Sequence, residues 1–188
     1  MGWKICSVWF ITVPWLTEQA QGSRRSNLGI FLDALLFIGP SYVANAAPLL
    51  LGGGSPLDGG KNFFDGERIL GAHKTVRGLF AGIIAGSVIG LAESPVDNRL
   101  LLGGIMIAMG TVLGDLVGAF LKRRIRIKPG SSLPVVDQLD FVFGGLLLGQ
   151  LVFPLSLWSI LVVVLVTPPI HLGTNYGAYL LGIKRTRW

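Results

Sequence analysis

The amino-acid sequence predicts an all-α, polytopic membrane protein with about five transmembrane helices and cytoplasmic loops. Its 188 residues are 51% apolar and only 14% charged, which is well below the charged fraction of an ordinary soluble domain. The apolar residues form long continuous runs with a mean hydropathy of +0.64 for the whole chain. Such runs favour membrane-spanning helices, since the strands of a membrane barrel would alternate apolar and polar residues.

Five apolar segments are candidates for these helices. They are Leu28–Leu51, Val76–Ala92, Arg99–Leu121, Leu139–Phe153 and Leu155–Gly173. A spanning helix needs about 20 residues, so the second and fourth segments are short for a span. Pro154 separates the last two segments, where a turn is expected because proline cannot continue a helix. The spacing of Gly82, Gly86 and Gly90 is typical of closely packed membrane helices.

Basic residues gather in three regions: the 52–75 loop with the adjoining Arg77, the 122–138 loop, and the C-terminus. With five spans these regions fall on one side of the membrane, and they hold twelve of the sixteen Lys and Arg residues. The positive-inside rule makes that side cytoplasmic. This distribution accounts for the net charge of +6, and no nucleic-acid partner is expected.

Residues 1–27 form an N-terminal extension to a single domain of residues 28–188. Lys4–Leu16 is apolar but too short to span a bilayer. Two interpretations of this extension remain: it is a segment that lies at the membrane interface, or the start of the chain is incorrectly assigned. Arg24 and Arg25 would lie on the outer side, against the positive-inside rule.

The cysteine and glycine content excludes two classes of site. Cys6 is the only cysteine, so an internal disulfide and a cysteine-ligated zinc site are excluded. The glycine-rich 52–75 loop lacks both the lysine spacing of a P-loop and a preceding strand, which excludes a P-loop NTPase.

Lys74, Thr75 and Arg77 stand at the expected start of the second helix. Lys74 and Arg77 share a face at i and i+3, beside the free N–H groups and positive dipole of a helix N-terminus. This combination predicts an anion site. The alternative is that these cations only set the orientation of the chain in the membrane.

Three aspartates lie near the cytoplasmic ends of the third and fourth segments. Asp115 and Lys122 are two helical turns apart on one face, and Asp137 and Asp140 are spaced i and i+3. A carboxylate at the depth of Asp115 is costly and indicates a functional site or an ion pair. The three carboxylates could form an oxygen-ligand Mg²⁺ site, while Asp137 and Asp140 could instead simply favour a helix start.

Other polar residues in the apolar segments carry weaker signals. Asn45, near the cytoplasmic end of the first segment, can reach a site at headgroup level, whereas Asp33 is expected to be structural or interfacial. His171 and Asn175 are expected to serve packing or hydrogen bonding.

Parts of the chain resemble a known family. Residues 114–145, GDLVGAFLKRRIRIKPGSSLPVVDQLDFVFGG, are similar to the C-terminal signature of the CTP:phosphatidate cytidylyltransferases. The five-span layout, NAAPLLLGGGSPLDGGKNFFDG at 45–66 and GAHKTVRG at 71–78 resemble more specifically the archaeal CDP-archaeol synthases. The resemblance covers about residues 28–188. Lys128 is followed by Pro129 where the bacterial pattern has an acidic residue.

The resemblance implies an enzyme that joins CTP to an archaeal isoprenoid ether-lipid phosphate with Mg²⁺ as cofactor. The implied metal ligands are the three aspartates Asp115, Asp137 and Asp140. The implied catalytic residues are Asp115, Lys122 and Asp140. The implied CTP-binding residues are Asn45, Lys61, Asp65, Lys74, Thr75 and Arg77.

Other functions stay open from the sequence. A CDP-alcohol phosphotransferase is disfavoured because its Asp-Gly-x-x-Ala-Arg pattern is absent from the chain. A small membrane transporter or a structural membrane protein is the alternative from another class. A transport path should carry polar residues through the midplane, whereas those of this sequence gather near one membrane face.

Overall fold

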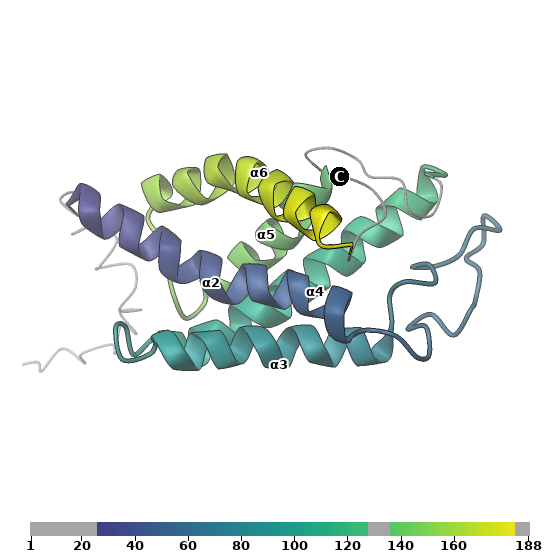
Figure 1. Ribbon diagram of the computed structural model, residues 1–188, viewed down its shortest axis with the longest axis horizontal. Coiled ribbons are helices and arrows are strands. Elements are labelled where there is room, and N and C mark those ends of the chain that lie inside the picture. The colour runs from purple at the N-terminus through teal and green to yellow at the C-terminus, as the bar shows by residue number, and fades with distance from the viewer. Residues whose placement is uncertain (1–25, 128–135, 183–188) are drawn as a thin grey trace, which may run out of the picture.

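The computed structural model describes residues 26–127 and 136–182, and its described part is all-helical (Figure 1). The helices are α2 (Asn27–Leu51), α3 (Val76–Glu93), α4 (Leu100–Arg124), α5 (Val136–Gly149) and α6 (Leu157–Leu180). Within the described ranges, β-pairing is limited to two isolated bridges in the 52–75 loop. The all-α prediction is therefore confirmed. Predictions for the N-terminal extension, for Lys128 and for the basic C-terminus lie outside the described residues.

The helices pack as a bundle in which α2 lies between α3 and α6 (Figure 1). α4 packs against both α3 and α5. Phe37, Ile107 and Phe141 are buried in the largest apolar core, and a second core joins Ala44 to Ala108 and Val112. A hydrogen bond of 2.9 Å between the buried hydroxyls of Ser41 and Thr111 ties α2 to α4 between these cores.

Glycines make the close contacts of the bundle. Every fully buried residue of α3 is a glycine, and these are Gly78, Gly82, Gly86 and Gly90. A Cβ added at Gly86 would come within 2.7 Å of both the Pro40 carbonyl oxygen on α2 and the Ala108 Cβ on α4. The glycine spacing seen in the sequence thus serves helix packing, because backbones can approach closely only where side chains are missing.

Four helices of the described part, α2, α3, α4 and α6, are long and apolar enough to cross a membrane. Their outward-facing side chains are large and apolar, for example Ile84 on α3, Leu113 on α4 and Leu165 on α6. A surface of this kind is stable against lipid chains and unstable against water. The polytopic membrane class predicted from composition is confirmed.

The fourth predicted span differs from the helix in the structure. The predicted segment ends at Phe153, but α5 ends at Gly149 and has only 14 residues. The chain then turns, and the Gln150 side chain accepts a hydrogen bond from the Leu155 amide at 2.7 Å and donates one to the Leu155 carbonyl at 3.4 Å. Backbone groups within a bilayer need such internal partners, since no water reaches them. The polar side chain of Gln150 therefore lets the backbone leave the helical conformation after Gly149.

The two ends of the bundle differ in character. The 52–75 loop, the C-terminus of α4 and the N-terminus of α5 share one end, joined by ion pairs described below. The turns after α3 and α5 share the opposite end, where the Arg99 guanidinium lies 5.3 Å from the Phe153 ring centre. The 52–75 loop and the described start of the basic loop after α4 thus lie at the same end of the bundle. The prediction of five spans also put these two loops on one side of the membrane.

Candidate active site

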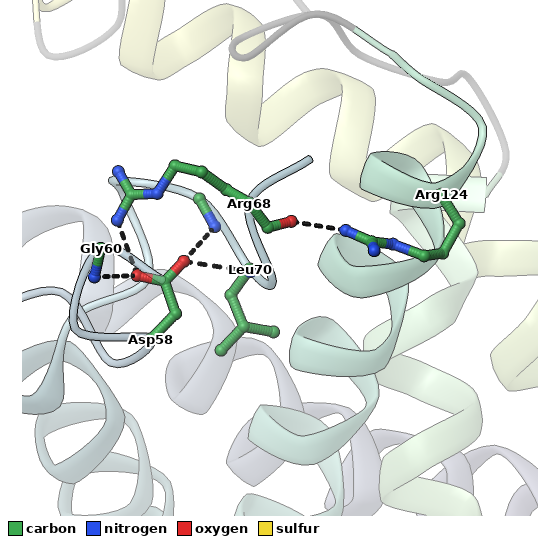
Figure 2. Close-up of polar contacts among 6 residues, drawn as sticks. Asp58, Gly60, Arg68, Leu70 and Arg124 are labelled. Carbon is green, nitrogen blue, oxygen red and sulfur yellow. Dashed lines mark hydrogen bonds and ion pairs between the residues drawn. The ribbon is translucent and has the colours of Figure 1, made fainter. Parts of the chain in front are cut away.

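The 52–75 loop is organised around the carboxylate of Asp58. That carboxylate accepts hydrogen bonds from the backbone amides of Gly60 at 3.0 Å, Leu70 at 3.1 Å and Gly71 at 3.0 Å (Figure 2). It also accepts a charged hydrogen bond of 2.6 Å from Arg68 Nη2. The Asp58 side chain is completely buried. Burial alone would raise the pKa of this carboxyl, but the four donors outweigh burial and hold its pKa well below its usual range.

A second contact fastens this loop to α4. Arg124, in the last turn of α4, donates a hydrogen bond of 2.7 Å to Asp65 Oδ1. It also donates one of 2.6 Å to the Arg68 carbonyl (Figure 2). Its guanidinium also lies 4.7 Å from the Phe63 ring centre and 4.8 Å from that of Phe120. The loop and the helix that carries Asp115 therefore meet through one multiply bonded arginine.

Thr75 joins the loop to α3. As the N-cap residue, its hydroxyl oxygen accepts hydrogen bonds from the Gly78 amide at 3.1 Å and the Gly53 amide at 3.2 Å. The predicted position of Lys74 and Thr75 at a helix start is confirmed. Arg77 is exposed in the first turn of α3.

Two lysines lie against two of the predicted metal-binding aspartates. Lys74 Nζ pairs with Asp115 Oδ2, and Lys122 Nζ lies 2.9 Å from Asp137 Oδ1. The side chains are 25% and 27% exposed in the first pair and 15% and 17% in the second. Each pair joins two elements, so ion pairs connect the 52–75 loop, α4 and α5. All four charged side chains remain partly exposed on the protein surface.

Asp140 completes this group. Its Oδ1 accepts a hydrogen bond of 2.6 Å from the Phe141 amide, and its carboxylate packs against Gly118 on α4. The charges of Asp115, Lys122 and Asp137 all act on it. The three aspartates and two of the lysines that the sequence singled out therefore converge at one end of the α4–α5 interface. We call Lys74, Asp115, Lys122, Asp137 and Asp140 the charged cluster.

The donor chemistry of the charged cluster suits a hard divalent cation, because its acidic members offer only carboxylate oxygens. Within the described residues, however, no three acidic, histidine or cysteine side chains lie close enough together to hold a metal ion. Lysines hold two of the three carboxylates instead. The residues fit a cation in type but are arranged here around ammonium groups.

Asn45 is placed near the charged cluster by helix geometry. Ser41 on α2 bonds to Thr111 on α4, and Asn45 and Asp115 each lie four residues further along their helices towards the same end. Residues four apart share a helix face, so Asn45 and Asp115 lie at the same level of the bundle, one turn beyond the contact between Ser41 and Thr111. Lys61 is exposed on the 52–75 loop. Asp33, in contrast, is buried in the opposite half of α2, away from the cluster.

Sequence reasoning missed Asp58, Arg68 and Arg124. The run Leu57-Asp58-Gly59-Gly60 does carry a turn signal, because aspartate before glycine commonly bonds to nearby amides. No local pattern indicated that Arg124 would reach a loop 59 residues away in the chain.

The bundle and the charged cluster define a class: a polytopic membrane protein with lysines and carboxylates gathered at one end, an arrangement suited to phosphate-bearing substrates. A family model described as CarS-like, CDP-archaeol synthase, matches residues 27–188. The chain belongs to the CDP-archaeol synthase family.

Relatives agree along most of the chain. A protein of Methanocaldococcus jannaschii named CDP-archaeol synthase is 40% identical over 173 residues, which cover 85% of this chain and 98% of the relative. One of Methanopyrus kandleri with the same name is 43% identical over 159 residues, covering 82% and 91% of the two chains.

A solved structure also matches the fold. It is described as an intramembrane enzyme for archaeal membrane lipids biosynthesis, and it superposes with a TM-score of 0.72 at 35% identity. The match covers 77% of this chain and 93% of the other.

Proposed function

We propose that this protein transfers a cytidylyl group from CTP to an archaeal ether-lipid phosphate, unsaturated archaetidic acid. The products are CDP-archaeol and pyrophosphate, used in membrane phospholipid biosynthesis. Membership of the CDP-archaeol synthase family supports the reaction. The observation that carries the proposal to individual residues is the convergence of the charged cluster from a loop and two helices.

In this reaction an oxygen of the lipid phosphate attacks the α-phosphorus of CTP. A new P–O bond forms as the bond from the α-phosphorus to the bridging oxygen breaks, and pyrophosphate leaves with that electron pair. No general base is needed, because a phosphate monoester is already ionised at neutral pH.

Lys74 and Lys122 serve this step as movable cations. Each makes an ion pair with one aspartate and is partly exposed. A triphosphate carries more negative charge than one carboxylate, so it draws both ammonium groups towards its oxygens. Thr75 and Arg77 at the N-terminus of α3 add backbone N–H groups and a further cation to the same region. Lys61 and Asn45 extend this nucleotide-binding region.

The release of both lysines frees the Asp115 and Asp137 carboxylates beside Asp140. We assign these three side chains to Mg²⁺. The ion, when bound, would neutralise phosphate charge and orient the reacting groups. The lipid chains stay in the bilayer while the headgroup reaches the charged cluster. We place the charged cluster on the cytoplasmic side because the positive-inside rule assigns the neighbouring basic loops to that side.

A transporter is less well supported. Polar residues buried at mid-depth in the described helices, such as Ser41 and Thr111, bond to one another. A transport path would need polar groups that face an opening through the bundle.

The test is a radiolabel transfer assay. Purified protein is incubated with labelled CTP, Mg²⁺ and a geranylgeranylated glycerol phosphate lipid, and the label in the lipid extract is counted. We expect label with wild-type protein, and at least about a hundredfold less with Asp115→Asn. Asp97→Asn, which alters an ion-paired aspartate at the opposite end of the bundle, is the matched control and should retain activity. Wild-type protein that transfers no label would contradict the proposal.

A further inference from the structure

The cations around the charged cluster differ in how firmly they are held. Lys74 and Lys122 each form an ion pair with one carboxylate. The guanidinium of Arg124 instead bonds to Asp65 and to the carbonyls of Glu67 at 3.4 Å and Arg68 at 2.6 Å. A guanidinium fork with this many partners has few donors left for a phosphate.

The surroundings of Arg124 hold it further in place. Phe63 on the loop and Phe120 on α4 both contact its guanidinium, and the two rings pack edge to face at 5.4 Å. The side chain is only 17% exposed. Contacts with aromatic rings strengthen as the cation loses water, so moving Arg124 to a ligand would break several interactions together.

Asp65 has the matching role on the loop. Besides the Arg124 pair, its Oδ1 accepts a hydrogen bond of 3.1 Å from the Glu67 amide. Arg124 donates a hydrogen bond to the backbone carbonyl of Arg68, and the side chain of Arg68 donates one to Asp58 (Figure 2). A series of hydrogen bonds therefore connects α4 to the buried Asp58 carboxylate at the centre of the 52–75 loop, which also carries Lys74.

We infer that Arg124 and Asp65 are a positioning pair that holds the 52–75 loop, and with it Lys74, against α4, and that neither contacts the nucleotide. This inference rests on the proposed function and replaces the sequence-based assignment of Asp65 to CTP binding. Without the pair, Lys74 would leave its place beside Asp115. A misplacement of about 1 Å at a reacting site can cost roughly a hundredfold in rate.

The chain contains a matched control for this pair. Arg99 and Asp97 form a comparable ion pair at 2.6 Å, with the arginine also over an aromatic ring, at the opposite end of the bundle. Arg124→Lys and Asp65→Asn are therefore compared with Arg99→Lys and Asp97→Asn. Lysine keeps the charge of Arg124 but loses the fork that reaches three oxygens.

Steady-state kinetics and proteolysis are measured on all four variants. We expect Arg124→Lys and Asp65→Asn each to raise KM for CTP by about tenfold or more, with KM for the lipid unchanged. The KM for CTP of the double variant should be no higher than that of the more impaired single variant, because both changes break the same contact between Arg124 and Asp65. Without CTP, trypsin should cut the 52–75 loop faster in both variants and at the wild-type rate in the controls.

Two results would overturn the inference. If Asp65→Asn lowers KM for CTP while Arg124→Lys raises it, Arg124 is a phosphate ligand that Asp65 restrains. If trypsin cuts faster but KM for CTP stays at the wild-type value, the pair stabilises the loop without positioning the site. Wild-type protein that makes no CDP-lipid would instead contradict the proposed function, and the trypsin comparison would still test the loop attachment.

Discussion

Asp58 is a buried carboxylate whose partners all lie within its own loop. Replacement of Asp58 by asparagine keeps the shape of the side chain but puts an NH₂ group in place of one carboxylate oxygen. Each of these oxygens accepts hydrogen bonds from two donors in the wild type. With Oδ2 replaced, the Leu70 and Gly71 amides lose their acceptor. We expect Asp58→Asn to lower the free energy of loop opening by about 2 kcal/mol. Hydrogen exchange of these two amides measures the change, and Asp97→Asn should leave both amides as protected as in the wild type.

The same carboxylate makes the loop sensitive to acid. Because folding lowers the pKa of Asp58, its ionised form stabilises the folded loop above the usual aspartate pKa of about 3.9. That contribution is lost as the pH falls below this value, because the opened loop then takes up a proton that the folded loop does not. We expect amide protection in the loop, corrected for intrinsic exchange, to be constant from about pH 7 to about pH 5 and to fall towards about pH 3.

The Asp58→Asn variant checks this cause. Its loop should show weaker protection at neutral pH, and the remaining protection should vary less with acid. An equal acid response in wild type and variant would assign the effect to other groups.

At the residue scale, the sequence predicted which residue types gather but not how they pair. Residues spaced along one helix, such as Asp115 and Lys122, could be placed on one face from the helical repeat. Their actual partners, Lys74 and Asp137, come from other elements, and no periodicity relates a loop to a helix 41 residues away.

The contact between α4 and α5 depends on glycines, and two of them separate activity from stability. A Cβ at Gly118 would overlap the Asp140 carboxylate, while one at Gly144 would overlap the backbone carbonyl of Gly110. A side chain can rotate away, whereas a helix backbone cannot move without disturbing its neighbours.

We therefore expect Gly118→Ala to reduce lipid labelling by roughly a hundredfold with little change in thermal unfolding. Gly144→Ala should lower the free energy of unfolding by about 2 kcal/mol. Gly173→Ala on α6, where a Cβ meets no atom within 4 Å, is the control: it should leave lipid labelling unchanged and should not lower the free energy of unfolding. Equal effects of Gly118→Ala and Gly144→Ala on stability would contradict the distinction.

Helix positions followed from the apolar runs, and the ends of α2 and α3 lie within one residue of the predicted ends, but those of α5 and α6 do not. α6 continues to Leu180, seven residues beyond the predicted Gly173, although its sequence becomes more polar there. α5 stops early because Gln150 supplies bonds to a turn. Both outcomes depend on contacts outside the segment, which hydropathy does not contain.

At the scale of the whole molecule, the position of the basic loops predicts the sidedness of the protein. Phe64 at the tip of the 52–75 loop is 98% exposed, and Asn98 is exposed in the turn at the opposite end. In a Cys6→Ser background, a cysteine is placed at either position. We expect an impermeant maleimide to label Asn98→Cys in intact cells and Phe64→Cys only after permeabilisation. The reverse pattern would place the charged cluster outside the cell.

The short α5 also constrains how the protein is assembled. Its 14 residues rise about 21 Å at 1.5 Å per residue, against a hydrocarbon core of about 30 Å. A segment of this length is a poor substrate for insertion by itself. Its glycine contacts with α4 and the Gln150 turn that leads into α6 supply what length does not. We therefore expect α5 and α6 to insert together, as a hairpin whose α5 arm packs on an α4 that is already in place.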